Sequence, residues 1–248
     1  MGKTSVVLQK TFKPVPKGIS LVIGCSTFPI WNSVPGIFAS LITGNSVIVK
    51  PHPKSVYPIA VVVAEIQNAL QAKDINVNVC QLAVDASDNL ITKKLAENQL
   101  VKLIDYTGSS SFGNYIESLQ GKTTFTEKAG VNSVILDSVI DLKPVVQNLA
   151  FAVSLYSGQM CTAPQNIFVA ADGVKTEAGQ VSYDEVVAKI ANAVKALVEN
   201  PKMGPCTLGA IQNDLTGQRV TDAAKSNTVA LDSIAGQNPE FPHARMKS

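Results

Sequence analysis

The stretch "GISLVIGCSTFPIWNSVPGIFASLITGNSVIVK", residues 18–50, decides the fold that we expect for this chain. Its first and last parts, residues 18–24 and 45–50, are short apolar runs that indicate β-strands. Between them, residues 32–44 predict a short helix that Gly44 closes. The order strand, helix, strand is typical of parallel α/β sheets, in which helical crossovers cover both faces of the sheet.

The same alternation continues along the chain. The apolar positions Ile59, Val63, Ile66 and Leu70 recur at helical spacing and therefore lie on one face of a helix. After about residue 130 a second α/β region begins, and the two regions meet in residues 123–132. The last 40 or so residues show weak periodicity and end in "GQNPEFPHARMKS", residues 236–248, which closes no evident element. The further expected elements are strands at 76–83, 101–106, 132–137 and 166–170 and helices at 142–157 and 182–198.

Composition excludes several classes of function. The chain has 248 residues, of which 46% are hydrophobic and 16% charged, which is typical of a globular protein. Its net charge of +2 gives little support to a nucleic-acid or membrane partner, and no apolar run approaches the roughly 18 residues that span a bilayer. The four cysteines, Cys25, Cys80, Cys161 and Cys206, are widely spaced, which predicts no metal site and a reducing, cytoplasmic setting.

Two polar features follow strands, where open α/β sheets bind ligands. Asn32 could donate its side-chain amide to a developing oxyanion, or it could cap the helix that follows. Gly108 and Ser109, in "YTGSSSFG" at 106–113, follow a strand and open a helix, which suits a phosphate group. An ordinary strand-to-helix turn explains them equally well, since no Walker lysine and no complete GxGxxG motif is present.

Two reactive side chains stand later in the chain. Cys161 lies in "YSGQMCTAPQ", residues 156–165, but both histidines, His52 and His243, are far away in the sequence. A single cysteine is more often an inert core residue than a nucleophile. Glu127 could act as a general base, or it could be a surface carboxylate paired with Lys122 or Lys128.

Five segments taken together, in order, resemble motifs of the aldehyde dehydrogenase superfamily. They are "PIWN" (29–32), "GNSVIVKP" (44–51), "YTGSSSFG" (106–113), "EKAG" (127–130) and "GQMCTAPQ" (158–165). Their wording is most similar to the branch associated with phenylacetic acid degradation. The resemblance implies an α/β fold in which an open parallel-sheet NAD(P)-binding domain, residues 1–128, precedes part of a second, catalytic α/β domain, residues 129–248.

The resemblance also implies a mechanism. Cys161 attacks the carbon of an aldehyde substrate and forms a thiohemiacetal, whose oxyanion is held by the Asn32 amide and the Cys161 backbone N–H. Hydride then passes to the nicotinamide cofactor, which leaves a thioester. Water activated by Glu127 hydrolyses this thioester to the carboxylic acid.

The resemblance carries the cofactor contacts over by position. Lys50 reaches the adenosine ribose, Gly108 and Ser109 lie beside the pyrophosphate, and Trp31 belongs to the same cofactor-binding set. Where many NAD-preferring members have a glutamate, this chain has Pro53. Because that glutamate would repel a 2′-phosphate, its absence leaves room for NADP as well as NAD, with Lys54 or His52 as a partner.

The chain departs from the family pattern in two ways. Lys128 and Ala129 replace the usual Leu-Gly pair after Glu127, and the part that follows Cys161 lacks the Glu-x-Phe-Gly-Pro segment. The chain therefore resembles a central fragment of a longer, homo-oligomeric enzyme. Two alternatives stay open: a CoA-acylating relative, in which CoA takes the acyl group, and a catalytically inactive cofactor-binding fragment.

Overall fold

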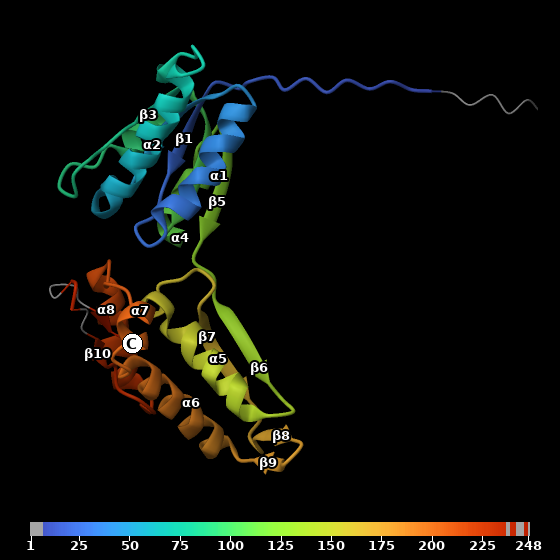
Figure 1. Ribbon diagram of the computed structural model, residues 1–248, viewed down its shortest axis with the longest axis vertical. Coiled ribbons are helices and arrows are strands. Elements are labelled where there is room, and N and C mark those ends of the chain that lie inside the picture. The colour runs from blue at the N-terminus through green and yellow to red at the C-terminus, as the bar shows by residue number, and fades with distance from the viewer. Residues whose placement is uncertain (1–6, 237–238, 242–245, 248) are drawn as a thin grey trace, which may run out of the picture. The chain divides into compact units, whose positions relative to one another are not determined.

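The chain forms two compact units, residues 1–128 and 129–248, in a computed structural model that describes residues 7–236, 239–241 and 246–247 (Figure 1). Each unit contains its own clusters of buried apolar side chains.

The first unit is built on a five-stranded sheet with the order β3-β2-β1-β4-β5. All neighbouring strands are parallel, which confirms the predicted open parallel sheet. Because the strand order reverses between β1 and β4, the carboxyl ends of these strands form the edge at which such sheets bind ligands. The strands are β1 (Ile19–Ile23), β2 (Ser46–Lys50), β3 (Cys80–Leu82), β4 (Val101–Gly108) and β5 (Thr123–Lys128).

Helices cover both faces of this sheet. Val22 of β1 packs in the cluster that α1 and α2 complete, whereas its neighbours Leu21 and Ile23 pack with α3 and α4. Successive side chains of a strand point to opposite faces, so β1 is apolar except for Ser20 because both of its faces are buried. The helices are α1 (Pro29–Ile42), α2 (Val56–Gln71), α3 (Thr92–Glu97) and α4 (Ser110–Ser118), with 3-10 turns η1 (Pro53–Ser55) and η2 (Val77–Val79).

Two predictions about this unit need correction. Helix α1 begins at Pro29, earlier than expected, so Asn32 lies inside the helix and does not cap it. Proline is favoured at the first helical position because its missing N–H has no helical partner there. The strand predicted at 76–83 is wrong in its first half, where the Asn76 side chain accepts a hydrogen bond from the Asn78 N–H at 2.9 Å and starts a 3-10 turn.

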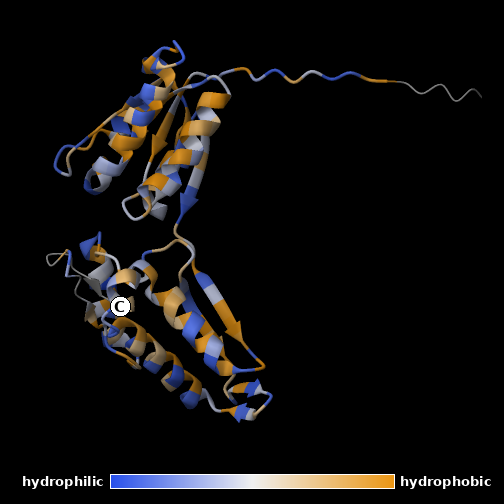
Figure 2. Cartoon of the chain, viewed as in Figure 1, coloured by the Kyte–Doolittle hydropathy of each residue, from blue (hydrophilic) through white to orange (hydrophobic). Residues whose placement is uncertain are grey.

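The second unit contains a parallel pair of strands, β6 and β7, and the long helices α5 and α6. Figure 2 shows that β6 is largely hydrophobic, whereas α6 alternates hydrophobic and hydrophilic residues, as expected for a helix with one buried side. Leu136, Val146 and Val186 from these elements form the core. The elements are β6 (Asn132–Leu136), α5 (Leu142–Ser154), η3 (Leu155–Gly158), β7 (Pro164–Val169), the antiparallel hairpin β8 (Val174–Thr176) and β9 (Gly179–Val181), and α6 (Tyr183–Val198).

The last 40 or so residues, whose weak periodicity gave no evident element at their end, contain the helix α8 (Asp214–Ser226) and a pairing of β10 (Ala235–Gly236) with β11 (Met246–Lys247). The short helix α7 (Met203–Thr207) precedes them. Helix α8 has no buried residue, and its polar residues outnumber its apolar ones, so its apolar pattern is weak. Its signal is the cap, since the Asn213 side chain accepts a hydrogen bond from the Leu215 N–H at 2.9 Å. His243 lies outside the described residues.

Candidate active site

Asn32 and Glu127 meet at the carboxyl edge of the first unit's sheet. The Asn32 amide nitrogen donates to Glu127 Oε2 at 3.3 Å, across 95 residues of sequence. The amide oxygen of Asn32 accepts from the Cys25 thiol at 3.4 Å, and the Phe28 N–H donates to the same sulfur at 3.4 Å. Cys25 therefore orients the amide so that its N–H groups face Glu127.

A third polar side chain lies at this site beside Asn32 and Glu127, the carboxylate of Asp105 on β4. It was not predicted from the sequence. Burial, followed by the nearby charge of Glu127, raises the pKa of Asp105 to about 6. The signal in the sequence was an acidic residue directly after the apolar pair Leu103 and Ile104 of the strand. A cavity of about 280 Å³ is lined by residues that include Trp31, Asn32, Asp105 and Glu127.

The alternative interpretation of Glu127 as one half of a surface ion pair is wrong for the described residues. The Lys128 ammonium pairs with Glu117 at 2.9 Å, and Lys122 donates to the backbone carbonyls of Asn98 and Val101 at 2.8 Å. Glu127 is exposed, and its partner is the Asn32 amide. Ala129 stands where the family pattern has glycine. It does not strain the adjoining backbone, because neither Ala129 nor Gly130 has a positive φ.

Lys50, at the end of β2, is buried rather than extended into solvent. Its ammonium nitrogen forms an ion pair with Asp85 Oδ1 at 2.5 Å, and the two side chains are 3% and 0% exposed. The same nitrogen donates to the Pro51 carbonyl at 3.0 Å. Asp85 follows β3, the neighbouring strand, so parallel pairing brings both residues to one edge. Asp85 was not among the site residues predicted from the sequence.

Gly108 and Ser109 form the predicted strand-to-helix turn. Ser109 is the N-cap of α4, and its hydroxyl accepts a hydrogen bond from the Phe112 N–H at 3.5 Å. A side chain at position 108 would meet the Tyr106 hydroxyl at 2.5 Å, while that hydroxyl donates to the Ser109 carbonyl at 2.9 Å. The glycine is therefore required by close packing, and the turn presents the N-terminal end of a helix at the carboxyl edge.

Cys161 belongs to the second unit, where it is exposed, so the interpretation as an inert core cysteine is wrong. The segment before it has an unusual backbone, because Tyr156, Ser157 and Gly158 all have positive φ, at 51°, 58° and 68°. Such conformations are unfavourable for residues other than glycine and must be held by their surroundings.

Side chains hold this segment in place. The Gln159 amide donates to the carbonyls of Tyr156 at 2.9 Å and Ala210 at 3.0 Å, and its oxygen accepts from the Gln212 N–H at 2.9 Å. The Ser157 hydroxyl donates to the Gly209 carbonyl at 2.8 Å. Both N–H donors of the Gln159 amide and its oxygen thus bind backbone groups.

Asn132 contacts the chain on the other side of Cys161. Its amide nitrogen donates to the Cys161 carbonyl at 2.6 Å and to the Ala163 carbonyl at 3.1 Å. Gln159 and Asn132 therefore fix the backbone on both sides of the nucleophile candidate. Neither role was visible in the sequence, because both depend on contacts between distant segments.

The part of the chain that the structure describes contains neither a cluster of metal-ligating side chains nor a helix that could span a membrane. No cluster of three or more His, Cys, Asp or Glu side chains could hold a metal ion there. Among the same residues, no helix has the length and apolar character required to cross a membrane.

Comparison with known proteins identifies the family. Residues 4–240 match the model of the aldehyde dehydrogenase family, and the chain belongs to that family. The fold agrees, since the crystal structure of an NAD-dependent aldehyde dehydrogenase from Burkholderia multivorans superposes with a TM-score of 0.88 at 46% identity, covering 94% of this chain and 42% of that one.

Other relatives include the benzaldehyde dehydrogenase YfmT of Bacillus subtilis, which is 27% identical over 214 residues, or 84% of this chain and 40% of the relative. The NADP complex of the glyceraldehyde-3-phosphate dehydrogenase GapN from Methanocaldococcus jannaschii shares the fold at 24% identity, with a TM-score of 0.72 over 93% of this chain and 49% of that one. The chain spans less than half the length of these relatives.

Proposed function

We propose that this chain carries the cofactor-binding and nucleophile-bearing parts of an NAD(P)-dependent aldehyde dehydrogenase, which oxidises an aldehyde to a carboxylic acid. Residues 1–128 would form the NAD(P)-binding domain and residues 129–248 part of the catalytic domain. The observation that carries the proposal is the oriented Asn32–Glu127 pair at the ligand-binding edge of the sheet. An exposed Cys161 in a tightly held segment supports it.

In the proposed reaction the Cys161 thiolate adds to the aldehyde carbon, and the carbonyl oxygen becomes an oxyanion. The Asn32 amide donates to Glu127 in this structure, and in the reaction it would bind the oxyanion together with the Cys161 backbone N–H. Because the Cys25 thiol fixes the amide oxygen, the donor side of Asn32 is preorganised and needs little reorientation during the reaction.

The cofactor site fits a dinucleotide. Lys50 at the end of β2 and the turn at Gly108 and Ser109 lie at the carboxyl edge of one parallel sheet, where such ligands bind. These residues, with Pro53 and Trp31, would hold the cofactor. When it is bound, its nicotinamide ring accepts the hydride from the substrate.

Glu127 would complete the reaction by removing a proton from water. The resulting hydroxide adds to the thioester carbon, the carbon–sulfur bond breaks, and the products are the carboxylic acid and the Cys161 thiol. A water-activating carboxylate is useful chiefly for hydrolysis, which favours water over CoA as the acyl acceptor. Analysis of the products formed with and without CoA tests this choice.

We propose an aromatic aldehyde as the substrate class, with phenylacetate-type catabolism as its setting. The support is the wording of the sequence motifs and the similarity to a benzaldehyde dehydrogenase. Turnover of benzaldehyde and phenylacetaldehyde, measured against short aliphatic aldehydes, tests the class. A homo-oligomeric longer parent and a cytoplasmic location stay predictions, which light scattering and cell fractionation test.

The mechanism is tested by replacing the nucleophile. With an aldehyde and NAD⁺ or NADP⁺, we expect the wild type to form reduced cofactor, followed by its absorbance, and Cys161→Ala to abolish that signal. Cys206→Ala is the matched control, because Cys206 is also an exposed cysteine of the second unit. Activity retained in Cys161→Ala would contradict the mechanism. A wild type that binds cofactor without turnover would support the inactive fragment instead.

A further inference from the structure

The ion pair between Lys50 and Asp85 is the feature of the cofactor site that the proposed chemistry leaves unexplained. Both side chains are almost fully buried, and the nitrogen–oxygen distance is 2.5 Å. The second carboxylate oxygen of Asp85 accepts a hydrogen bond from the Ile91 N–H at 3.1 Å. One oxygen of Asp85 is therefore held by a hydrogen bond, and the other lies beside the Lys50 ammonium.

The contacts of Lys50 leave it little capacity for a ligand. The ammonium group carries one positive charge, and its nitrogen donates to the Pro51 carbonyl and lies 2.5 Å from Asp85 Oδ1, whose negative charge offsets it. A group with so little net charge suits a neutral hydroxyl such as that of a ribose. A 2′-phosphate carries nearly two negative charges and three acceptor oxygens, and it requires more donors and a net positive charge.

His52, the residue that precedes the turn η1, does not replace the missing charge. Burial, followed by the charges of Lys50 and Lys54, lowers the pKa of His52 below its ordinary value, so the imidazole is neutral at pH 7. Its Nδ1 atom is already an acceptor for the Lys54 N–H at 3.1 Å. His52 is thus unsuited to pair with a 2′-phosphate, contrary to the expectation from the sequence.

We propose that Asp85 makes the cofactor site selective for NAD⁺ over NADP⁺ by neutralising Lys50. The proposal rests on the proposed function, in which Lys50 contacts the adenosine ribose. Pro53 stands in the turn η1 where many members of the family have a glutamate, and it has no charge with which to repel a 2′-phosphate. We assign that exclusion to Asp85, which lies on the loop after β3, the neighbouring strand.

The experiment measures the dissociation constants of NAD⁺ and NADP⁺ for the whole chain by isothermal titration calorimetry. We expect the wild type to bind NAD⁺ at least about tenfold more tightly than NADP⁺. Asp85→Asn keeps the shape of the side chain and removes its charge, so the preference should fall by about tenfold, mainly because NADP⁺ binds more tightly.

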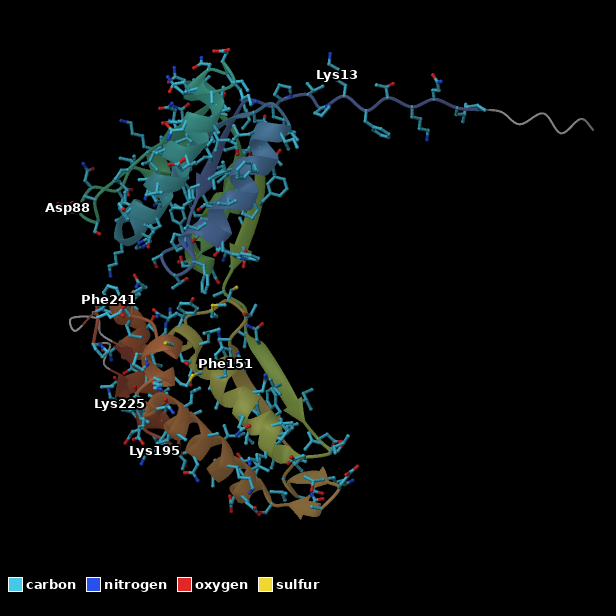
Figure 3. All side chains as sticks on the ribbon, viewed as in Figure 1. Lys13, Asp88, Phe151, Lys195, Lys225 and Phe241 are labelled. Carbon is cyan, nitrogen blue, oxygen red and sulfur yellow. The ribbon has the colours of Figure 1, made fainter. Side chains whose placement is uncertain are left out.

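Asp88→Asn is the matched control, because Asp88 is an exposed acidic residue on the same loop (Figure 3). The control makes the same change in net charge and should leave the preference unchanged. Thermal unfolding checks that each variant folds. If Asp85→Asn does not fold, Asp85→Ser replaces it, since serine can accept from the Ile91 N–H and leaves room for water beside Lys50.

The outcomes separate the two proposals. Equal binding of both cofactors by the wild type, or an unchanged preference in the Asp85 variant, would overturn the role of Asp85 and leave the proposed function intact. No binding of either cofactor would contradict the cofactor site itself, and with it the selectivity.

Discussion

Gln159 stabilises a backbone conformation that the residues beside it disfavour. Tyr156 and Ser157 both have positive φ, which costs on the order of 1–3 kcal/mol for each residue. The Gln159 amide offsets this cost through its hydrogen bonds to Tyr156, Ala210 and Gln212. The segment that presents Cys161 is therefore maintained by tertiary contacts rather than by local preference.

Gln159→Ala should loosen this segment. We expect faster hydrogen exchange in residues 156–163 and a loss of about 1–3 kcal/mol in the free energy of unfolding, because backbone groups lose their partners. Gln180→Ala is the control, since the Gln180 amide also donates to a backbone carbonyl, that of Asp172 at 2.8 Å, but far from the nucleophile in the sequence. Equal exchange of residues 156–163 in both variants would contradict the role of Gln159.

The raised pKa of Asp105 predicts that the stability of the protein depends on pH. The pKa of its carboxyl is raised from the ordinary value of 3.8 to about 6, so between these values the native state binds more protons than the unfolded state. The contribution of Asp105 to stability is therefore most favourable below about pH 4 and is lost as the pH rises through about 6.

Asp105→Asn should remove this dependence. Because the amide carries no charge to desolvate, we expect the variant to be more stable than the wild type near pH 8, by on the order of 1–2 kcal/mol, and to lose this advantage near pH 4. Urea unfolding of both proteins at the two pH values measures the difference. A variant that is less stable than the wild type near pH 8 would show that the carboxylate is needed in its charged form.

Helix α1 depends on a glycine where it crosses β4. A Cβ atom at Gly36 would approach Asp105 Oδ2 to 2.6 Å, which is closer than ordinary contacts allow. Close approach of helix and strand at this point positions the part of α1 that carries Asn32. The usual gain of about 1 kcal/mol from replacing glycine in a helix is therefore outweighed by overpacking.

Gly36→Ala should destabilise the protein by about 1–3 kcal/mol, as measured by chemical unfolding. Gly217→Ala is the control on another helix, α8, where nothing lies within 4 Å of the added Cβ atom. That variant should be neutral or up to about 1 kcal/mol more stable, because only the helix propensity changes. Similar effects of the two substitutions would contradict the contact between α1 and Asp105.

As a whole, the molecule divides its chemistry between two units with separate cores. The first unit, residues 1–128, carries Asn32, Glu127 and the Lys50–Asp85 pair, and the second, residues 129–248, carries Cys161 and the side chains that hold it. Since each unit has its own buried clusters, the substitutions described above test each unit independently.

The amino-acid sequence by itself determined the α/β architecture, because burial and apolar periodicity are local properties of a segment. It also placed the turn at Gly108 and Ser109 correctly. It did not reveal α8, which is rich in polar residues and has no buried residue, nor the turn at Asn76, where a side chain competes with the strand.

Only the tertiary structure decided which partners the site residues have. The pairing of Asn32 with Glu127 depends on the order of strands in the sheet, which brings together residues 95 positions apart. The Lys50–Asp85 pair depends on strand order in the same way, whereas the contact of Gln159 with Gln212 joins two segments outside the sheets. Such contacts are invisible in a sequence, because local patterns carry no information about which distant segments become neighbours.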